Sequence, residues 1–382
     1  MNAIFTKFRV SLLAGAVALG SMSAPVLAIE DVLVTPSIKA VKAKESLLLD
    51  IAKAGERLVV VGARGHILYS DDNGKKWHQA DVPVSVLLTS VVFPSAKNGW
   101  AVGHSGVILH SSDGGQTWAK QFDGNAANEM IITQSQNYVD KLRVKVEQAS
   151  EDDLEDIEIE LEEAEYSLED AQADSEIGPS KPLLDVFFMN DREGIAVGAY
   201  GFIFKTIEGG TTWKNYGPML GNPDRFHLNT ITQVGGRVLL VAGEAGVIFR
   251  SEDRGETWET IESPYEGSFF GLAETGEGMS VLAFGLRGNL FRSVDAGKTW
   301  EAVDSETEST LIAGARNKQG DISIVGNSGS VIFSDDGGRT FSETIREDRL
   351  GVSSATFITK NELIVVGEKG VLRTSSAGTN LN

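Results

Sequence analysis

The stretch "SSDGGQTW", residues 111–118, decides the fold because variants of it recur along the whole chain. The other copies begin at 70, 206, 251, 293 and 334, and a degraded copy, "TSSAGTNL", begins at 374. Neighbouring copies are 40 to 45 residues apart, except for one interval of 95 residues. A period of this length with strand-like composition is typical of the blades of a β-propeller.

Each copy has the same sequence of strand-like segments around it. In the first repeat these are "LLLDIA" (47–52), "RLVVVG" (57–62) and "GARGHILYS" (62–70). A fourth short segment ends each repeat, for example "TWAKQF" (117–122) in the second. Apolar and β-branched runs bounded by Gly and Asp are typical of strands. Four strands in each of seven repeats predict an all-β, seven-bladed β-propeller.

The repeated box is expected to form the turn between the third and fourth strands of a blade. Its acidic residue can accept hydrogen bonds from backbone amides, and its Gly can take a left-handed conformation. The aromatic residue at its end is expected to pack in the core, contributing about 2–3 kcal/mol by burial. These structural box residues are Asp71, Asp72, Trp77, Asp113, Trp118, Glu208, Trp213, Asp253, Trp258, Asp295, Trp300, Asp336 and Phe341.

Residues 1–28 have the pattern of a cleavable signal peptide. Lys7 and Arg9 precede an apolar run over 10–20, and small residues end the segment at Ala28. The apolar run is too short to span a bilayer, and no later segment predicts a transmembrane anchor. The sequence therefore predicts a protein exported to the periplasm, or secreted.

The last repeat ends too close to the end of the chain to supply a fourth strand. A strand-like segment, "DVLVTPSIKAV" (31–41), precedes the first complete repeat. Pairing this segment into the seventh blade would close the ring and cover an exposed edge. The predicted organisation is a closing strand and two blades over 29–122, an insertion over 123–181, and five blades over 182–382.

The insertion over 123–181 changes the apolar periodicity from two to about 3.5. Two heptad runs on either side of Ser150 predict an antiparallel helical hairpin, in which Ser150 caps the second helix. Residues 151–176 contain fourteen acidic residues and no basic one. This acidic helix is either a solvated face or an arm that docks a basic partner, and the candidate docking residues are Glu158, Glu162, Glu165 and Glu169.

The composition excludes several functions. The formal net charge of −20 argues against nucleic acid and anionic membranes, and favours neutral or basic partners. The chain has no Cys, and its five His are scattered singly. No phosphate loop or catalytic constellation is found, so the sequence predicts neither a metal nor a cofactor. We expect a monomer that acts by binding.

The pattern G-x-x-G-x-[IL]-[FLY]-x-S-x-D-x-G-x-T-W resembles the Asp-box (BNR) propellers. The regular array, with GxxG before each box, is similar to the photosystem II stability/assembly-factor family over about 31–122 and 183–382. That resemblance implies a non-enzymatic protein that binds partly assembled membrane proteins from the lumenal or periplasmic side. It also implies, for relatives in non-photosynthetic bacteria, a client such as a resistance-nodulation-division (RND) transporter.

The GxxG turns and the insertion are expected to share one face of the propeller, with the boxes on the other. The client is therefore predicted to contact side chains on the GxxG face, and the resemblance implies that basic residues take part. The candidate partner-binding residues there are Arg64, His104, Tyr200, Arg225, Tyr265, Arg287 and Lys369.

Two alternative functions remain open at the level of sequence. Asp boxes also occur in sialidases, but the arginine triad, the Tyr nucleophile and the Arg-Ile-Pro motif of those glycoside hydrolases are not recognisable here. A carbohydrate-binding propeller is the other alternative, because exposed rings at Tyr200, Tyr265 and Phe269 could stack on a pyranose.

Overall fold

The computed structural model describes residues 31–381 of the 382-residue chain, so the predicted signal peptide lies outside the described residues. The described strands form seven antiparallel sheets, each with its strands in sequential order. Six of these sheets contain four strands and the last contains three. The mostly-β fold predicted from the repeats is confirmed.

The sheets are built from the following strands, in chain order. The first contains β1 (Leu48–Ala54), β2 (Arg57–Gly62), β3 (Ile67–Ser70) and β4 (His78–Gln79); the second β5 (Leu88–Val92), β6 (Gly99–Gly103), β7 (Ile108–Ser111) and β8 (Ala119–Phe122); the third β9 (Leu183–Phe188), β10 (Gly194–Gly198), β11 (Ile203–Thr206) and β12 (Lys214–Asn215); the fourth β13 (Leu228–Val234), β14 (Val238–Gly243), β15 (Ile248–Ser251) and β16 (Glu259–Ile261); the fifth β17 (Phe269–Glu274), β18 (Val281–Gly285), β19 (Leu290–Ser293) and β20 (Glu301–Ala302); the sixth β21 (Leu311–Arg316), β22 (Ile322–Gly326), β23 (Ser330–Ser334) and β24 (Ser342–Ile345); the seventh β25 (Val352–Thr359), β26 (Glu362–Gly367) and β27 (Gly370–Ser375).

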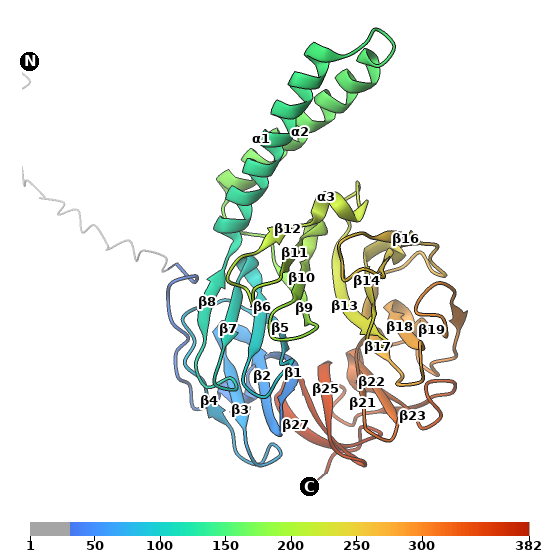
Figure 1. Cartoon of the computed structure of the whole chain (residues 1–382). Helices are drawn as coiled ribbons and strands as arrows, with labels where there is room; N and C mark the ends of the chain where they lie inside the picture. The colour runs from blue at the N-terminus through green and yellow to red at the C-terminus, as the bar shows by residue number, and fades with distance from the viewer. Residues whose placement is uncertain (1–30, 382) are drawn as a thin grey trace, which may run out of the picture. The chain divides into compact units, whose positions relative to one another are not determined.

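The first strand of each sheet lies at the centre of the assembly (Figure 1). These inner strands contact one another in the cycle β1, β5, β9, β13, β17, β21, β25 and back to β1. The second strands are almost entirely buried, as in "GWAVG" of β6 and "GIAVG" of β10. A strand buried on both faces needs a continuous apolar sequence rather than an alternating one, which explains the runs seen in the repeats.

The box at 111–118 forms a closed hydrogen-bond network. Ser111 Oγ accepts from the Gly115 amide at 2.8 Å and donates to Asp113 Oδ1 at 2.9 Å. The same carboxylate accepts from the Thr117 amide at 3.0 Å and from the Thr117 hydroxyl at 2.7 Å. Trp118 Nε1 donates to the Gly115 carbonyl, and Gly115 has a φ of +87°. The turn therefore satisfies its own polar groups while it buries an indole ring.

Several boxes depart from this pattern, and in the fourth the buried indole nitrogen of Trp258 has no hydrogen-bond partner among the described residues. In the first, Asp72 accepts from the Lys76 amide at 2.8 Å, whereas Asp71 lies outside the turn network and pairs with Arg57 at 2.7 Å. The expectation that Asp71 is also a turn residue was wrong, because only the third position of the box points into the turn. In the third box, Glu208 accepts from the Thr212 hydroxyl alone, and the buried indole nitrogen of Trp213 has no partner.

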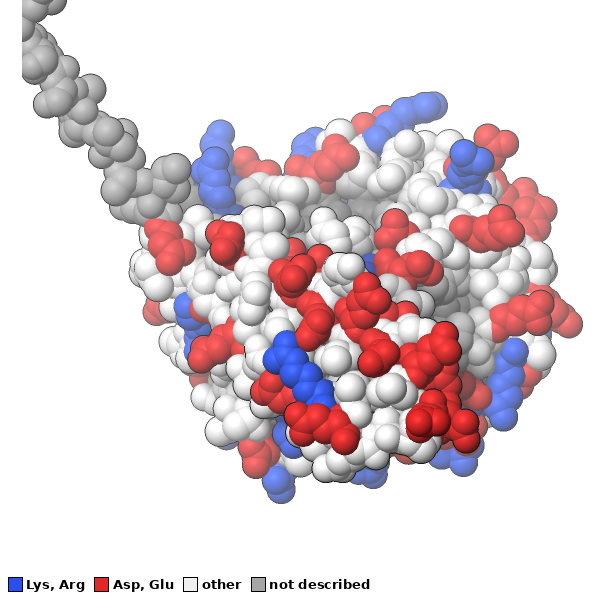
Figure 2. Space-filling model, turned by 90° about the horizontal axis from the view of Figure 1, so that it is seen from above, with Lys and Arg blue, Asp and Glu red and all other residues white. Residues whose placement is uncertain are grey.

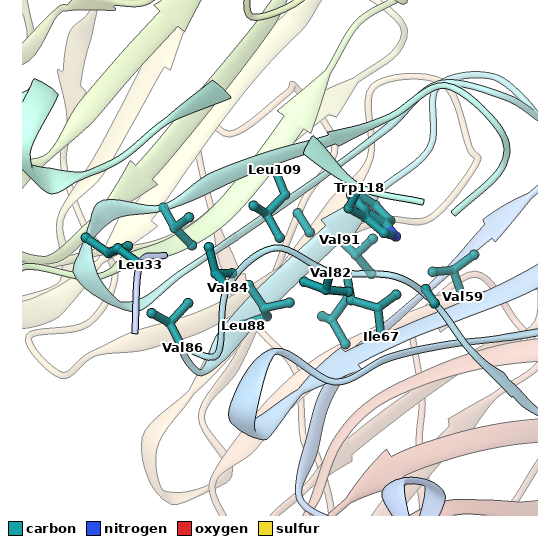
Figure 3. Packing of buried hydrophobic residues seen from close by; sticks show 14 of the residues in the cluster. Leu33, Val59, Ile67, Val82, Val84, Val86, Leu88, Val91, Leu109 and Trp118 are labelled. Atoms are coloured by element: carbon teal, nitrogen blue, oxygen red, sulfur yellow. The ribbon is translucent and has the colours of Figure 1, made fainter. Parts of the chain in front are cut away.

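The N-terminal segment 31–41 does not close the ring. It contains no strand and lies beside the link between the first and second sheets, where the Ser85 amide donates to the Val32 carbonyl at 2.9 Å. Leu33 is buried in the same core cluster as Val84 and Leu109 (Figure 3). The predicted closing strand was wrong because Leu33 is buried in this cluster and the segment does not pair with the seventh sheet.

The seventh sheet meets the first through packing rather than through a shared strand. Ile364 and Val366 of β26 are buried against Leu48 and Val60 of the first sheet. Beyond β27 the chain turns back, and a single antiparallel bridge joins Thr374 to Asn380. A single bridge therefore stands in place of a fourth strand in this sheet. The seventh sheet packs against the first without that strand.

The insertion forms a helical hairpin, as predicted. Helix α1 (Gly124–Gln148) begins after Asp123, whose side chain accepts from the Asn125 and Ala126 amides. Helix α2 (Leu154–Ile177) begins after Asp153 and not at Ser150, which lies in the connecting turn and donates to the Asp153 carboxylate. The predicted cap at Ser150 was wrong because the turn extends three residues further. The seam buries Val139 and Leu142 of α1 against Ala164 and Leu168 of α2.

The third box predicts a stabilising substitution. Glu208→Asp shortens the side chain, so its carboxylate can reach the turn amides as Asp113 does. We expect a gain of about 1 kcal/mol in the free energy of unfolding, the usual contribution of one hydrogen bond, measured by urea denaturation. The reciprocal Asp113→Glu variant is the control and should lose a similar amount. A Glu208→Asp variant no more stable than the wild type would contradict the role given to the carboxylate.

Candidate partner-binding surfaces

The GxxG sequences form short 3₁₀ turns between the second and third strands of six sheets. Their middle residue is held in the left-handed region, with φ of +56° at Arg64, +57° at Tyr200 and +56° at Arg287. The following Gly is required in the first turn, since a Cβ on Gly65 would lie 2.2 Å from the Val84 carbonyl oxygen. The turns are η2 (Ala63–Gly65), η3 (His104–Gly106), η4 (Ala199–Gly201), η5 (Glu244–Gly246), η6 (Leu286–Gly288) and η7 (Asn327–Gly329).

The structure brings together two of the predicted partner-binding residues beside the hairpin. Helix α1 contacts η3, so the hairpin and the GxxG turns share one face. Arg225 lies 3.5 Å from Asp170 of α2, and the Tyr200 ring packs 5.0 Å from His227. Lys181 Nζ lies 5.3 Å from the centre of the Tyr200 ring. The α2 helix therefore has polar and aromatic neighbours at its base.

The other predicted residues are dispersed. Arg64, His104, Arg287 and Lys369 are exposed, but each belongs to a different sheet. They do not form the basic patch that the resemblance implies for this face. Figure 2, which looks down on the hairpin side, shows Asp and Glu concentrated over one area and only scattered Lys and Arg.

The predicted aromatic platform is absent from this face. Tyr265 packs against Phe269 at 5.9 Å and against Phe291 at 6.0 Å. Phe269 is fully buried, so the expectation that it is exposed was wrong. These side chains fill the space between the fourth and fifth sheets, which leaves Tyr200 as the one exposed ring of the predicted three.

The four predicted docking acids lie along one side of α2. Glu165 pairs with Arg143 of α1 at 2.7 Å, while Glu162 accepts from the Tyr166 hydroxyl at 3.4 Å. Glu158 and Glu169 are exposed. The acids thus face solvent beside the hairpin seam, and part of their charge is balanced by α1.

A basic surface lies at the other end of the sheets, where the first strand of each sheet turns into the second. We call it the basic rim. Its side chains are exposed, and none of them forms an ion pair with another residue among those that the structure describes. The basic rim consists of Lys53, Lys97, Arg192, Arg237, Arg316, Lys318 and Lys360.

Neighbouring turns of the rim are in contact. Asn98 Nδ2 donates to Asp191 at 2.7 Å, and the Gly235 amide donates to Glu274 at 2.9 Å. Asn317 Nδ2 lies 3.5 Å from the Lys360 carbonyl oxygen. These contacts hold Asp191 and Glu274 by hydrogen bonds, while none of the seven rim bases forms an ion pair with a described residue.

A polar groove of about 360 Å³ continues from the rim between the fifth and sixth sheets. Three bases line it, Arg316, Lys318 and Arg339, together with three acids, Glu277, Asp335 and Asp336. Glu277 is engaged by Arg339 at 2.6 Å. Partial burial lowers the pKa of Lys53; the charge of Glu56 opposes this shift, and the charge of Lys318 adds a smaller contribution to it.

Sequence reasoning missed the basic rim. Its residues come from six different repeats, so no single motif contains them. The signal that could have found it is the register of the turns: once the boxes are placed, each turn between first and second strands must lie on the box face. These turns, with the strand ends beside them, carry a base in six of the seven sheets.

Two carboxylates lie between the inner strands. Asp50 of β1 accepts from Ser354 at 2.8 Å and from the Val91 amide at 2.8 Å. Asp185 of β9 accepts from Ser90 at 2.8 Å and from the Ile231 amide at 2.9 Å. Ser90 also lies 3.2 Å from Asp50, so one hydroxyl links the two acids.

The two acids share an unusual electrostatic setting. Burial raises the pKa of Asp185 to about 6, and the nearby charge of Asp50 adds to the rise, while the hydrogen bonds from Ile231 and Ser90 oppose it. Burial likewise raises the pKa of Asp50. Every carboxylate oxygen already accepts a protein hydrogen bond. The pair is thus arranged to join sheets rather than to meet a substrate.

Residues 31–381 contain neither a candidate metal site nor a helix that could span a membrane. No three side chains of His, Asp or Glu in this range come together in a way that could hold a metal ion. None of the helices described there is both long enough and apolar enough to cross a bilayer.

These features define a ring of antiparallel sheets with a basic rim at one end and an acidic hairpin at the other. Residues 37–129 and 167–323, well over half of the chain, match the family described as photosynthesis system II assembly factor YCF48. The chain belongs to this family, which confirms the resemblance found in its sequence. The match leaves out residues 130–166, most of which belong to the hairpin.

Two relatives share short stretches of sequence. A 67-residue stretch is 33% identical to the chloroplastic photosystem II stability/assembly factor HCF136 of Guillardia theta, covering 17% of each chain. A 67-residue stretch is also 33% identical to the photosystem II assembly lipoprotein Ycf48 of Synechococcus sp. (strain CC9902), covering 16% of this chain and 20% of the relative. The alignments thus span less than a quarter of either relative.

Solved structures share the fold. YCF48 bound to D1 peptide superposes with a TM-score of 0.59 at 16% identity, over 86% of this chain and 93% of that one. The GH74 enzyme of Niastella koreensis superposes with a TM-score of 0.57 at 14% identity, over 88% of this chain and 54% of that one. At such identities the likeness concerns the fold alone.

The linked acids predict a pH dependence of stability. Because the pKa of Asp185 is raised by folding, its contribution is fully present below pH 4 and is lost as the pH rises through about 6. Relative to Asp185→Asn, the wild type should lose about 2 kcal/mol of unfolding free energy between pH 4 and pH 7. Urea denaturation across this range measures the difference. The Ser90→Ala control keeps the acid and should keep the pH dependence; parallel profiles for wild type and Asp185→Asn would contradict the assignment.

Proposed function

We propose that the chain is a non-enzymatic, seven-bladed Asp-box propeller that binds an extended segment of a membrane protein and assists its assembly. The observation that carries the proposal is the basic rim with its adjoining groove. Seven exposed bases without carboxylate partners suit a segment with acidic side chains or a terminal carboxylate. The relative whose structure contains a D1 peptide supports a membrane-protein segment as the ligand.

The absence of catalysis is part of the proposal. A glycoside hydrolase needs two carboxylates that are free to meet substrate and water. The one linked pair between the inner strands, Asp50 and Asp185, accepts hydrogen bonds from Ser90, Ser354 and backbone amides instead. Carbohydrate binding is disfavoured for a similar reason, since the Phe269 ring is buried.

The place of action follows from the predicted signal peptide and from the family. Export would bring the basic rim to the periplasmic or lumenal side of a membrane, where segments of membrane proteins emerge. The relative from Synechococcus is named as a photosystem II assembly lipoprotein. We propose that this chain acts there as a monomer. The comparisons offer no observation that favours an RND transporter as its client.

Charge reversal on the rim tests the proposal. The Lys318→Glu/Lys360→Glu variant removes two bases on neighbouring turns. We expect it to reduce capture of a membrane-protein client from native membranes at least tenfold, because opposite charge is replaced by like charge. Crosslinking with the full chain, affinity purification and quantitative mass spectrometry measure the capture.

A matched control makes the same charge change away from the rim. Lys75 lies in a box turn and Lys214 on the outer strand β12, and both are exposed. Lys75→Glu/Lys214→Glu should leave capture within twofold of the wild type. Equal loss of capture in both variants would show that the effect depends on the net charge of the chain and not on the rim. No loss in either variant would contradict the rim as the binding surface.

A further inference from the structure

The outer face of α2 carries apolar side chains that are largely exposed and packed against none of the residues 31–381. Ile159, Tyr166 and Ile177 are 52%, 61% and 74% exposed, and Ala173 is exposed as well. Positions 159, 166 and 173 are seven apart, and 177 follows one turn later, so they align on one face of the helix. We call these four residues the outer stripe.

The outer stripe faces away from α1. Leu161, Ala164 and Leu168 form the buried seam with α1. Ile159 and Tyr166 each precede a seam residue by two positions, which turns a side chain about 200° around the helix axis. The stripe is therefore not a frayed part of the seam but a second apolar face, on the opposite side of the same helix.

Acidic side chains flank the outer stripe along its length. They lie at neighbouring helical positions on both sides, and α2 contains no base anywhere. The bases of the hairpin belong to α1, where Arg143 pairs with Glu165, and Arg225 lies 3.5 Å from Asp170 at the base of α2. The acids that flank the stripe are Glu155, Glu162, Glu163 and Asp170.

We infer that the outer stripe docks a cationic amphipathic helix of a partner protein. An apolar ridge on the partner would cover Ile159, Tyr166 and Ile177, and Lys or Arg on either side of it would face the flanking acids. From 159 to 177 the stripe is about 27 Å long, enough for about five turns of a partner helix. The inference deepens the proposed protein-binding function, on which it rests, by adding a second surface.

Charge decides against two other occupants. A second copy of α2 would place acids against acids, which costs free energy at every flanking position. An anionic lipid surface would repel the helix for the same reason. A neutral apolar partner would leave the flanking acids unused. The cationic amphipathic helix is the occupant that satisfies both the stripe and its borders.

The test uses the full chain and three 18-residue peptides. The first has Leu on one face of a helix and Lys elsewhere, the second has the same composition in scrambled order, and the third replaces Lys by Glu. We expect only the first to bind, with the scrambled peptide at least tenfold weaker. Fluorescence anisotropy at two salt concentrations measures the binding, which should weaken at high salt.

Two variants locate the binding site. Ile159→Gln/Tyr166→Gln removes apolar surface without a helix-breaking residue, and should weaken binding of the first peptide at least tenfold. Val144→Gln on α1 changes a side chain that is 50% exposed, and should leave binding within twofold. Unchanged binding to Ile159→Gln/Tyr166→Gln, or equal loss in the Val144→Gln control, would overturn the inference.

Two further readouts separate the alternatives. Sedimentation velocity reports self-association: a wild-type dimer that Ile159→Gln/Tyr166→Gln converts to monomer would assign the stripe to a second copy and overturn the proposal. The rim variant Lys318→Glu/Lys360→Glu should bind the first peptide as the wild type does. If client capture fails to depend on the rim while stripe-dependent peptide binding persists, the proposed function falls and this inference stands.

Discussion

Asp50 on the first inner strand accepts a hydrogen bond from Ser354 on the last, and around this contact the first and last sheets pack together. The constraint behind it is that the second strand of every sheet is apolar on both faces. Such a strand is stable only between two other sheets, so the first and last sheets must cover each other. The positions of all the turns, and with them both candidate surfaces, depend on this closure.

The same closure explains why function separates onto two ends. Each sheet runs from a central strand to an outer one, so its turns alternate between two faces. The turns at one end carry the boxes on the outside and the basic rim on the inside. The turns at the other end carry the GxxG sequences and the hairpin. A chain with a net charge of −20 can therefore gather seven exposed bases at one end, while fourteen of its acids lie over residues 151–176 at the other.

The parts of the structure predictable from sequence are those that depend on local chemistry. The boxes and the apolar strands repeat with the period of the sheets, and the heptads change the period where the hairpin begins. Whether segment 31–41 closes the ring could not be predicted. The repeats show that the seventh sheet lacks a fourth strand, but they do not show which segment, if any, pairs there. Asp71 and Asp72 show the same limit within one turn. The two residues are chemically identical neighbours, and only the backbone of the turn decides that Asp72 accepts from its amides while Asp71 pairs with Arg57.

The candidate surfaces show this limit most clearly. Tyr265 and Phe269 are turn and strand residues that the fold uses for packing, which a sequence read one repeat at a time does not reveal. The bases of the rim come together only when separate sheets are arranged in a ring. The outer stripe was visible as Ile159 and Tyr166 seven residues apart, but its meaning depends on knowing which face of α2 is buried.

The proposed function requires that the basic rim contacts the client. A crosslinker that joins Lys side chains to carboxylates, applied to the full chain with its captured client and analysed by mass spectrometry, tests this contact directly. The account predicts that the crosslinks to the client map to Lys53, Lys97, Lys318 and Lys360. Crosslinks confined to Lys residues of the outer strands and the box turns, with none on these four, would contradict it.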